Sequence, residues 1–433
     1  MKKEKINVFF RDKRTLKICR IYTMLKTHAR QKHLSFHTPG HKIGKWDITE
    51  LSFSDNLSSP RGCIAQAEKE VAQILGAYKS FLLTDGSTCG VLSMLHAAKT
   101  LGVKSVAFPE TAHKSVWNGC ALLGLTPFPF SVEHEGGIPK PTVLKNVENV
   151  LLAADAILLT SPDYYGNIPD LFSFRKFCDD TKKLLLIDGA HGGHLHFDKA
   201  IYAGAFADLW VDGVHKSLPA LTQGAVVSAK DEKGAAALQK GVDIFRSTSP
   251  SYPILASVEY AVKAPQGKTA LYARALAEKY PQRMVLQKDF TKLCVRFGLH
   301  AFSAEKDLEK QGVYPEFCDG NILMFYLSCK TKKRALVRLE NALLKLFKKY
   351  PLESVEQIHA PVVLPKTTQT EWVNISDCEG KISAQNFGLF PPCVPLVKRG
   401  EQITKESLAL LQKADNVFGV YEEKLLIFKG EEV

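Results

Sequence analysis

Three segments of the chain carry residues that could perform chemistry together. Lys216 and Asp188 each follow a short apolar run, and so does the turn Gly86-Ser87-Thr88. A lysine amine can bond to an aldehyde, an acid can pair with a ring nitrogen, and a glycine turn with hydroxyls can hold a phosphate. Pyridoxal phosphate needs all three, so the segments predict a site for this cofactor.

Each segment also has a simpler interpretation. Lys216 could be a solvated lysine, Asp188 could cap a turn, and Ser87 and Thr88 are ordinary helix-capping residues. The order of the three segments and their places after apolar runs favour the cofactor site. Ala190, two residues after Asp188, is small enough to lie against one face of the cofactor ring.

Three histidines stand near these segments. His113 opens a predicted helix, where it could stack on the opposite face of the ring or only cap the helix. His191 could touch the ring oxygen or the bond to Lys216, or be a structural histidine. His215 adjoins the lysine and could add a contact to the phosphate. The candidate catalytic residues are thus Lys216, Asp188, His113 and His191.

The surrounding pattern alternates short apolar runs with amphipathic segments. This alternation predicts an α/β fold with a mostly parallel, doubly wound sheet, in which ligands bind beyond the carboxyl ends of the strands. All three segments fall at such ends. The strands are expected at 81–84, 105–108, 156–160, 184–187, 209–211 and 224–229, and the helices at 63–75, 88–101, 113–123 and 171–181.

The rest of the chain suggests two flanking units. A helical arm is predicted over residues 1–35, because the apolar residues Ile18, Ile21, Tyr22 and Leu25 recur at helical spacing. A cofactor-binding major domain is expected over 36–297 and a smaller α+β domain over 298–433. Further elements are predicted as helices at 254–263, 268–297, 332–349 and 405–414 and a strand at 322–328.

Composition narrows the class of protein. The 433 residues include 24% charged and 45% hydrophobic residues, typical of a globular protein, and the net charge of +12 is spread without an aromatic-interleaved basic stripe. We therefore expect no nucleic-acid partner. The ten cysteines show no CxxC pair and no Cys/His zinc spacing, which predicts reduced thiols and no metal site. Without a signal-peptide pattern or a run of membrane-spanning length, the protein is expected in the cytoplasm.

With these residues assembled, the chain resembles the Orn/Lys/Arg decarboxylase family of basic amino-acid decarboxylases, which has the aspartate aminotransferase-like fold called fold type I. The resemblance runs from about Leu34 to Ile403. The chain looks like the short type, without the N-terminal wing domain. The segments that carry the resemblance are Phe36-His37-Thr38-Pro39-Gly40-His41-Lys42, Asp47-Ile48-Thr49-Glu50-Leu51, Asp55-Asn56-Leu57, Gly86-Ser87-Thr88, His113-Lys114-Ser115, Ser161-Pro162-Asp163-Tyr164-Tyr165-Gly166, Asp188-Gly189-Ala190-His191-Gly192, His215-Lys216-Ser217-Leu218-Pro219 and Thr248-Ser249-Pro250-Ser251-Tyr252.

The resemblance implies a role for each site residue. It implies α-decarboxylation of arginine, lysine or ornithine, with the proton for the substrate carbon coming from Lys216 or His191. It also implies a homodimer in which the loop Ser249 to Tyr252, with Ser249 as a cofactor contact, reaches the neighbouring subunit's site. In the implied site Lys216 binds the cofactor, Asp188 pairs with the pyridine nitrogen, His113 stacks on the ring, and Ser87, Thr88 and His215 hold the phosphate.

Some positions depart from the family pattern. Gly213 stands where a serine is usual and so removes a hydroxyl from the phosphate site, and Cys393-Val394 replaces a Gly-Ile pair. A basic substrate needs an anion in its pocket, and the candidates, from either subunit, are Asp55, Asp163 and Glu401. The alternatives are another reaction of this fold, such as transamination or lyase chemistry, or a catalytically silent, cofactor-binding partner subunit.

Overall fold

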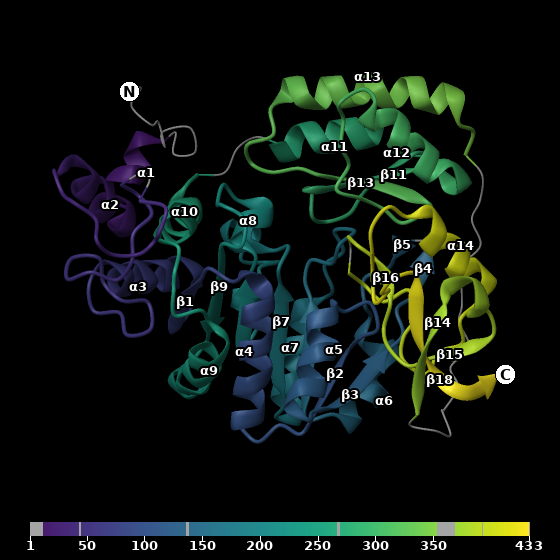
Figure 1. Ribbon diagram of the computed structural model, residues 1–433, viewed down its shortest axis with the longest axis horizontal. Helices are drawn as coiled ribbons and strands as arrows, with labels where there is room; N and C mark the ends of the chain where they lie inside the picture. The colour runs from purple at the N-terminus through teal and green to yellow at the C-terminus, as the bar shows by residue number, and fades with distance from the viewer. Residues whose placement is uncertain are drawn as a thin grey trace.

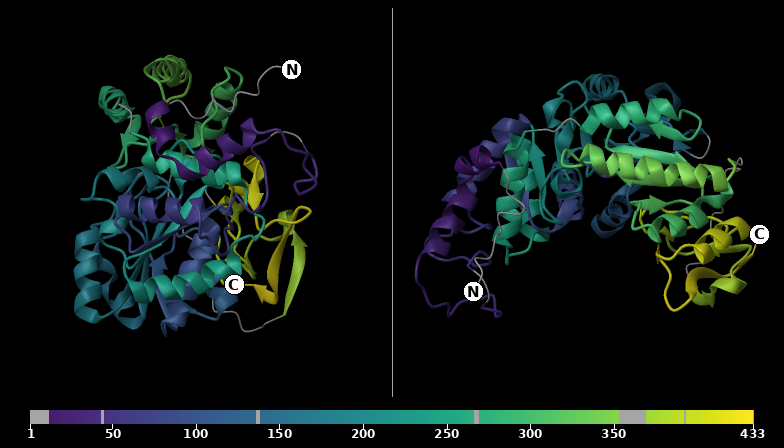
Figure 2. Two further views of the ribbon diagram at one scale, coloured as in Figure 1. Left: turned by 90° about the vertical axis from the view of Figure 1, so that its left-hand side faces the viewer. Right: turned by 90° about the horizontal axis from the view of Figure 1, so that it is seen from above.

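The computed structural model describes residues 12–42, 45–135, 138–265, 269–352, 369–391 and 393–432. A large sheet flanked by helices forms the centre of the molecule (Figure 1). Seen from above, the N-terminal arm and the carboxy-terminal units lie at opposite ends of this central body (Figure 2).

The central sheet has seven strands and confirms the predicted mostly parallel arrangement. The run from β8 to β3 is parallel, and β9 is antiparallel to both of its neighbours. In spatial order the strands are β1 (Lys79–Leu83), β9 (Ala225–Ala229), β8 (Leu209–Asp212), β7 (Leu184–Gly189), β6 (Ala156–Thr160), β2 (Ser105–Pro109) and β3 (Thr126–Phe130).

Helices cover both faces of this sheet, which explains why its strands are continuous apolar runs. Successive residues of β7 point to opposite faces: Leu185 and Ile187 belong to one core cluster and Leu186 to the other. The cluster of Leu186 is covered by α4 (Gly86–Thr100), α5 (Lys114–Leu123) and α9 (Glu232–Phe245); the other is covered by α3 (Cys63–Leu75), α6 (Leu144–Ala153), α7 (Leu171–Thr181) and α10 (Tyr252–Lys263).

The register of the sheet positions the site. Thr160 pairs with Asp188 and Gly189 pairs with Asp212, so the carboxyl ends of β6, β7 and β8 lie side by side. The short helix α8 (Val214–Ser217) begins just after β8, and the 3-10 helices η2 (Gly193–Phe197) and η3 (Ala203–Ala205) lie between β7 and β8.

The N-terminal arm is helical where the structure describes it, with α1 (Lys13–Lys17) and α2 (Arg20–Arg30). Ile21, Tyr22 and Leu25 are buried as the spacing predicted, but Ile18 is exposed. The reason is a break: Ile18 ends α1, so it does not share the buried face of α2. Residues 1–11 of the predicted arm lie outside the described residues.

The single helix predicted over 268–297 is wrong. The helix α11 (Thr269–Lys279) ends before Pro281, and the apolar runs beyond it form an antiparallel pair of strands. These strands belong to a four-stranded antiparallel sheet ordered β10 (Met284–Leu286), β11 (Lys292–Arg296), β13 (Ile322–Tyr326) and β12 (Phe317–Cys318). It packs with α11, η4 (Gly298–His300), α12 (Ala301–Glu309) and α13 (Lys333–Lys349) around one core cluster.

This sheet takes strands from both sides of residue 297, where the boundary of the two domains was predicted. We therefore propose that the division lies ahead of α11, because β11 pairs with β13 along its whole length. The last unit, yellow in Figure 1, has its own small core. It contains β14 (Thr370–Asn374), η5 (Ile375–Asp377), β15 (Lys381–Ser383), β16 (Gly388–Leu389), α14 (Lys405–Lys413), β17 (Val417–Phe418) and β18 (Lys424–Glu432). A separate short hairpin lies earlier in the chain and is formed by β4 (His134–Glu135) and β5 (Ile138–Pro139).

Over the part of the chain that the structure describes, no helix is both long enough and apolar enough to cross a membrane.

Candidate active site

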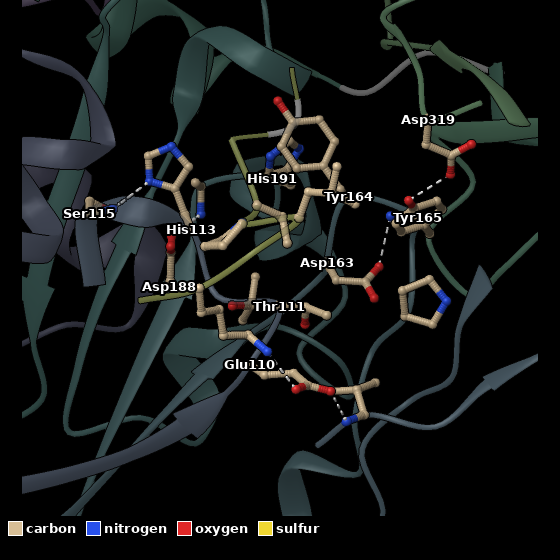
Figure 3. A pocket seen from close by; sticks show the side chains of 18 of the residues that line it. Glu110, Thr111, His113, Ser115, Asp163, Tyr164, Tyr165, Asp188, His191 and Asp319 are labelled. Carbon is tan, nitrogen blue, oxygen red and sulfur yellow. Dashed lines mark hydrogen bonds and ion pairs between the residues drawn. The ribbon is translucent and has the colours of Figure 1, made fainter. Parts of the chain in front are cut away.

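A cavity of about 970 Å³ opens at the carboxyl ends of the parallel strands. Residues after β1, β2, β6, β7 and β8 line one side of it, and residues of the carboxy-terminal units line the other. Figure 3 shows His113, Asp188 and His191 on the strand-end side, with Tyr165 bonded to Asp319 across from them. The cavity therefore lies where the sequence predicted a ligand.

Lys216 projects into this cavity from α8. Its Nζ lies 2.9 Å from Nε2 of His191 and 5.4 Å from the centre of the Tyr164 ring. Burial lowers the pKa of Lys216, although the negative charges of Asp188 and Glu316 act in the opposite direction. A lysine with a lowered pKa has more of the neutral amine that can attack an aldehyde.

His191 is buried and held between two aromatic rings. Its ring centre is 4.3 Å from that of Tyr164 and 5.8 Å from that of Tyr326. Burial and the neighbouring cations Lys216 and Lys292 hold the pKa of His191 well below its usual value. Its ring is therefore neutral, and the nitrogen facing Lys216 can share a proton with that amine.

Asp188 is the penultimate residue of β7, and its side chain is buried in the cavity wall. Oδ1 accepts a hydrogen bond of 3.0 Å from the backbone N–H of Ala190, which also lines the cavity. Burial raises the pKa of Asp188, and the Ala190 N–H and the charge of Lys216 lower it in part. A cation placed against this carboxylate, such as a protonated ring nitrogen, would stabilise its ionised form.

The start of α4 fits a phosphate. Gly86 has φ +74°, a conformation that glycine adopts without strain, and turns the chain from β1 into the helix. Ser87 and Thr88 line the cavity. The Ser87 hydroxyl is buried and has no hydrogen-bond partner among the described residues, so a ligand oxygen there would satisfy it.

His113 and His215 also line the cavity. Nδ1 of His113 accepts hydrogen bonds from the N–H and hydroxyl of Ser115, and burial, with the charge of Lys216, lowers the pKa of His113 to about 4. A neutral ring of this kind can stack on a flat ligand. Nδ1 of His215 donates to the carbonyl of Gly224 at 3.1 Å, which orients the ring beside the start of α8.

The structure explains why position 213 is a glycine and not the serine that is usual in the family. A Cβ atom at Gly213 would stand 2.0 Å from the carbonyl oxygen of Ala190 and 2.9 Å from the Ser87 hydroxyl. A side chain does not fit beside these two residues. The Ser87 hydroxyl already occupies the space near Gly213, so the phosphate site keeps one hydroxyl there.

Ser249 is not brought to this cavity within the chain. It is exposed, and its N–H donates to the Ser247 hydroxyl. Tyr252, at the other end of the predicted inter-subunit loop, is fully buried in its own chain, with its hydroxyl donating to the Asp55 carbonyl at 2.6 Å. Within this chain neither residue reaches the cavity, and the prediction that the loop Ser249 to Tyr252 reaches a neighbouring subunit's site stays a prediction.

The predicted substrate acids separate into two kinds. Asp55 lies outside the cavity lining, and its carboxylate accepts hydrogen bonds from the N–H groups of Asn56, Arg61, Gly62 and Ile64. These donors use both carboxylate oxygens to close a turn, so within this chain Asp55 is not brought to the cavity, and its role as a substrate ligand stays a prediction.

Asp163 and Glu401 do line the cavity, but each already has partners. Asp163 accepts three hydrogen bonds from Tyr165 and Asn167, and burial raises its pKa to about 6. Glu401 pairs with Lys398 at 2.9 Å.

Glu316 was missed by the sequence analysis. Its negative charge raises the pKa of Lys216, and among the acids only Asp188 has a larger effect on that pKa. Glu316 also interacts with the charge of Lys292. Burial raises the pKa of Glu316 and these two lysines lower it. Glu316 stands just before the short strand β12 with no motif around it, so no local signal marks it; only the folding of β12 against β13 brings it near Lys216.

The chain has fold type I, the aspartate aminotransferase-like architecture. The Orn/Lys/Arg decarboxylase major domain matches residues 20–289, and the C-terminal domain of the same family matches residues 342–419. The chain belongs to the Orn/Lys/Arg decarboxylase family.

Relatives cover nearly the whole chain. It is 28% identical to the uncharacterized protein YaaO of Bacillus subtilis (strain 168), over 95% of this chain and 99% of that protein. It is 26% identical to the arginine decarboxylase of the same organism, over 91% of this chain and 93% of that protein. The solved constitutive lysine decarboxylase of E. coli has the same fold, with a TM-score of 0.73 and 17% identity over 95% of this chain and 82% of that one.

Proposed function

We propose that this protein is a pyridoxal phosphate-dependent decarboxylase of arginine, lysine or ornithine. The observation that carries the proposal is the pairing of Lys216 Nζ with His191 Nε2 at 2.9 Å, in the cavity that Asp188 and Ser87 also line. An amine of lowered pKa, a buried carboxylate and an unpartnered hydroxyl answer the three needs of this cofactor.

The residues present fit the cofactor. Lys216 would hold its aldehyde carbon and Asp188 its ring nitrogen, while Ser87, Thr88 and His215 would hold its phosphate. His113 and Ala190 would lie against the two faces of the ring. When bound, the cofactor supplies an electron sink for the carbon that loses the carboxylate.

The protein's own part in the reaction is to move one proton. His191 Nε2 and Lys216 Nζ lie within hydrogen-bonding distance, so a proton can pass between them and either can deliver it to the substrate carbon. The rings of Tyr164 and Tyr326 hold the imidazole in place and exclude water from that side. Because the pKa of His191 is well below its usual value, the ring gives up a proton readily once it holds one.

Acids near Lys216 support a basic substrate. Glu316 acts on Lys216, and Asp163 and Glu401 line the same cavity. A cationic side chain entering a partly desolvated pocket needs such an anion, since an unpaired buried charge is costly. The similarity to an arginine decarboxylase over nine-tenths of the chain supports the same substrate class.

The test is a product assay. The purified protein, supplied with pyridoxal phosphate, is incubated separately with arginine, lysine and ornithine, and with norleucine as a neutral analogue of lysine. We expect CO₂ and the matching diamine or agmatine from at least one basic amino acid, and none from norleucine. Release of an oxo acid would indicate transamination, and no turnover of any substrate would indicate a silent subunit; either result contradicts the proposal.

We also propose a cytoplasmic homodimer. In the single chain, the side chains of Leu34 and Phe36 are 85% and 92% exposed. They stand close together where the arm joins the major domain, and such exposure of two large apolar side chains is unusual. A second subunit would bury them. None of the ten cysteines forms a disulfide, which fits a reducing compartment.

A further inference from the structure

A second lysine lies fully buried behind the active site. Lys292, the first residue of β11, donates to the carboxylate of Asp289, to the Thr291 hydroxyl at 2.9 Å and to the backbone carbonyl of His191 at 3.0 Å. These partners use all three N–H groups of the ammonium, which makes its burial tolerable. Neither residue of this buried ion pair takes part in the reaction proposed above.

The ion pair holds one turn of the major domain at two points. Lys292 holds the carbonyl of His191, and Asp289 accepts a hydrogen bond of 2.9 Å from Nε2 of His194. The N–H and hydroxyl of Thr291 donate to the same carboxylate oxygen of Asp289, at 2.9 and 2.8 Å. Residues between β10 and β11 therefore fix the turn that follows β7.

The same lysine also contacts the aromatic ring beside the His191 imidazole. Its Nζ lies 4.7 Å from the centre of the Tyr326 ring, and that ring stacks on His191 with an interplanar angle of 29°. Lys292 thus touches both the backbone of His191 and the ring that orients its side chain. Lys292 and His191 are buried and Tyr326 is half-buried, so these contacts form largely out of reach of bulk water.

We propose that Lys292, held by Asp289, is a positioning residue that fixes the turn 189–197 so that the His191 imidazole meets Lys216 Nζ. The inference rests on the proposed function for the catalytic meaning of that contact. The hold on the turn itself does not depend on any bound molecule. Because Asp289 and Lys292 flank the start of a small-domain strand, the placement of the small-domain sheet sets the geometry of a residue in the major domain.

The test removes both charges at once, so that neither is left buried alone. The variant is Asp289→Asn with Lys292→Met in the purified full-length chain. The matched control is Glu259→Gln with Lys263→Met, a buried pair at 2.7 Å that joins α10 to the arm and does not line the cavity. Amide hydrogen exchange of peptides covering 189–197 is measured by mass spectrometry, and kcat and KM are measured beside it.

In the Asp289/Lys292 variant we expect exchange over 189–197 to rise by about tenfold or more, whereas the control leaves that segment unchanged. We expect kcat to fall by roughly 10- to 100-fold with little change in KM, because the imidazole is misplaced but the substrate pocket is intact. In a His191→Ala background the same double substitution should lower kcat no further, since it acts through His191.

Unchanged exchange over 189–197 would overturn the proposal, as would an additive loss of kcat in the His191→Ala background. If the Asp289/Lys292 variant does not fold, the milder Thr291→Val replaces it, because it keeps the ion pair and removes only the hydroxyl that accepts from Lys292 and donates to Asp289. It should give a smaller rise in exchange over the same segment, and no rise would again overturn the proposal. If the wild-type protein proves to have no decarboxylase activity, the exchange comparison alone still decides whether Lys292 holds the turn.

Discussion

The two sides of the active-site cavity are built from different kinds of structure. On the strand-end side, Asp188 lies at the carboxyl end of β7 and Lys216 in the helix just after the adjacent parallel strand β8, and continuous pairing from β6 to β8 fixes the register of these strands. On the other side, Lys398 and Glu401 lie in a loop ahead of α14. Glu316 stands before the two-residue strand β12, outside the cavity lining but near enough for its charge to act on Lys216.

This difference has a chemical meaning. A cofactor needs its amine, anion and phosphate donors at fixed distances, and a buried sheet supplies rigid positions. A substrate side chain that differs in length between amino acids needs only an acid at a suitable depth, which a loop can supply. The chemistry of the site should therefore depend on the strand-end side, and the choice of amino acid on the other.

The largest effect is expected at Lys216. Lys216→Ala removes the amine that would hold the cofactor and share the proton with His191, and decarboxylation should fall by about 10³-fold or more. Lys230→Ala is the control: this lysine also follows a strand of the sheet, but its Nζ contacts the Gly204 carbonyl outside the cavity. Initial rates of CO₂ release compare the two, and a Lys216 variant within tenfold of wild type would contradict its role.

Asp188→Asn should cost roughly 100-fold in kcat with the fold retained. A neutral amide cannot stabilise a protonated ring nitrogen, and a charge-assisted pair in a dry site contributes several kcal/mol. Asp208→Asn serves as the control, because Asp208 pairs with Arg175 at 3.0 Å and lies outside the cavity lining. It should lower stability but leave kcat within about twofold; activity of Asp188→Asn close to wild type would show that this acid does not face the ring.

A smaller effect, confined to binding, is expected on the other side of the cavity. Glu316→Gln should raise KM for the basic substrate by a few-fold, since this carboxylate lies outside the cavity lining and acts through its charge rather than by a direct hydrogen bond. The affinity for pyridoxal phosphate should stay within about twofold. Glu401→Gln and Asp163→Asn, measured in parallel, should raise KM less because their carboxylates are already paired within the protein. If all three variants keep the wild-type KM, the acids do not select the substrate.

Asp55→Asn should affect stability alone. Burial by itself raises the pKa of Asp55, but hydrogen bonds from four backbone N–H groups outweigh it and the pKa is lowered from 3.8. An acid whose pKa is lower in the folded protein than in the unfolded chain stabilises the fold fully at a pH above the unfolded pKa. This stabilisation is lost as the pH falls through the folded pKa. Urea unfolding should show the variant less stable by about 1–3 kcal/mol at pH 7, with a difference that shrinks below pH 4. A raised KM would instead place Asp55 at the substrate.

Much of the major domain could be predicted from the sequence, because its strands are buried on both faces. Helices α3 and α7 and strand β6 have the predicted ends, and Lys216, Asp188 and Ser87, the residues predicted to bind a cofactor, line one cavity. Each of these residues lies at the carboxyl end of a strand or in the helix that begins just after one, so local pattern and sheet topology together were enough to place them.

The errors lie where contacts between distant segments decide. The strands β10 and β11 were predicted as helix, since their short apolar runs acquire a strand conformation only by pairing with each other and with β13. Glu316 and Lys292 act through neighbours far along the chain, and neither stands in a recognisable motif. Asp55 stands in a motif, but its carboxylate closes a turn, a role that the sequence does not distinguish from ligand binding.

The most direct test of the account is to find the amine that binds the cofactor. The purified protein, saturated with pyridoxal phosphate, is reduced with borohydride, digested and mapped by mass spectrometry. We predict a pyridoxyl group on the peptide that contains Lys216, at Lys216 itself. A pyridoxyl group on another lysine, or none on folded protein, would contradict the assignment of the strand-end side as the cofactor site.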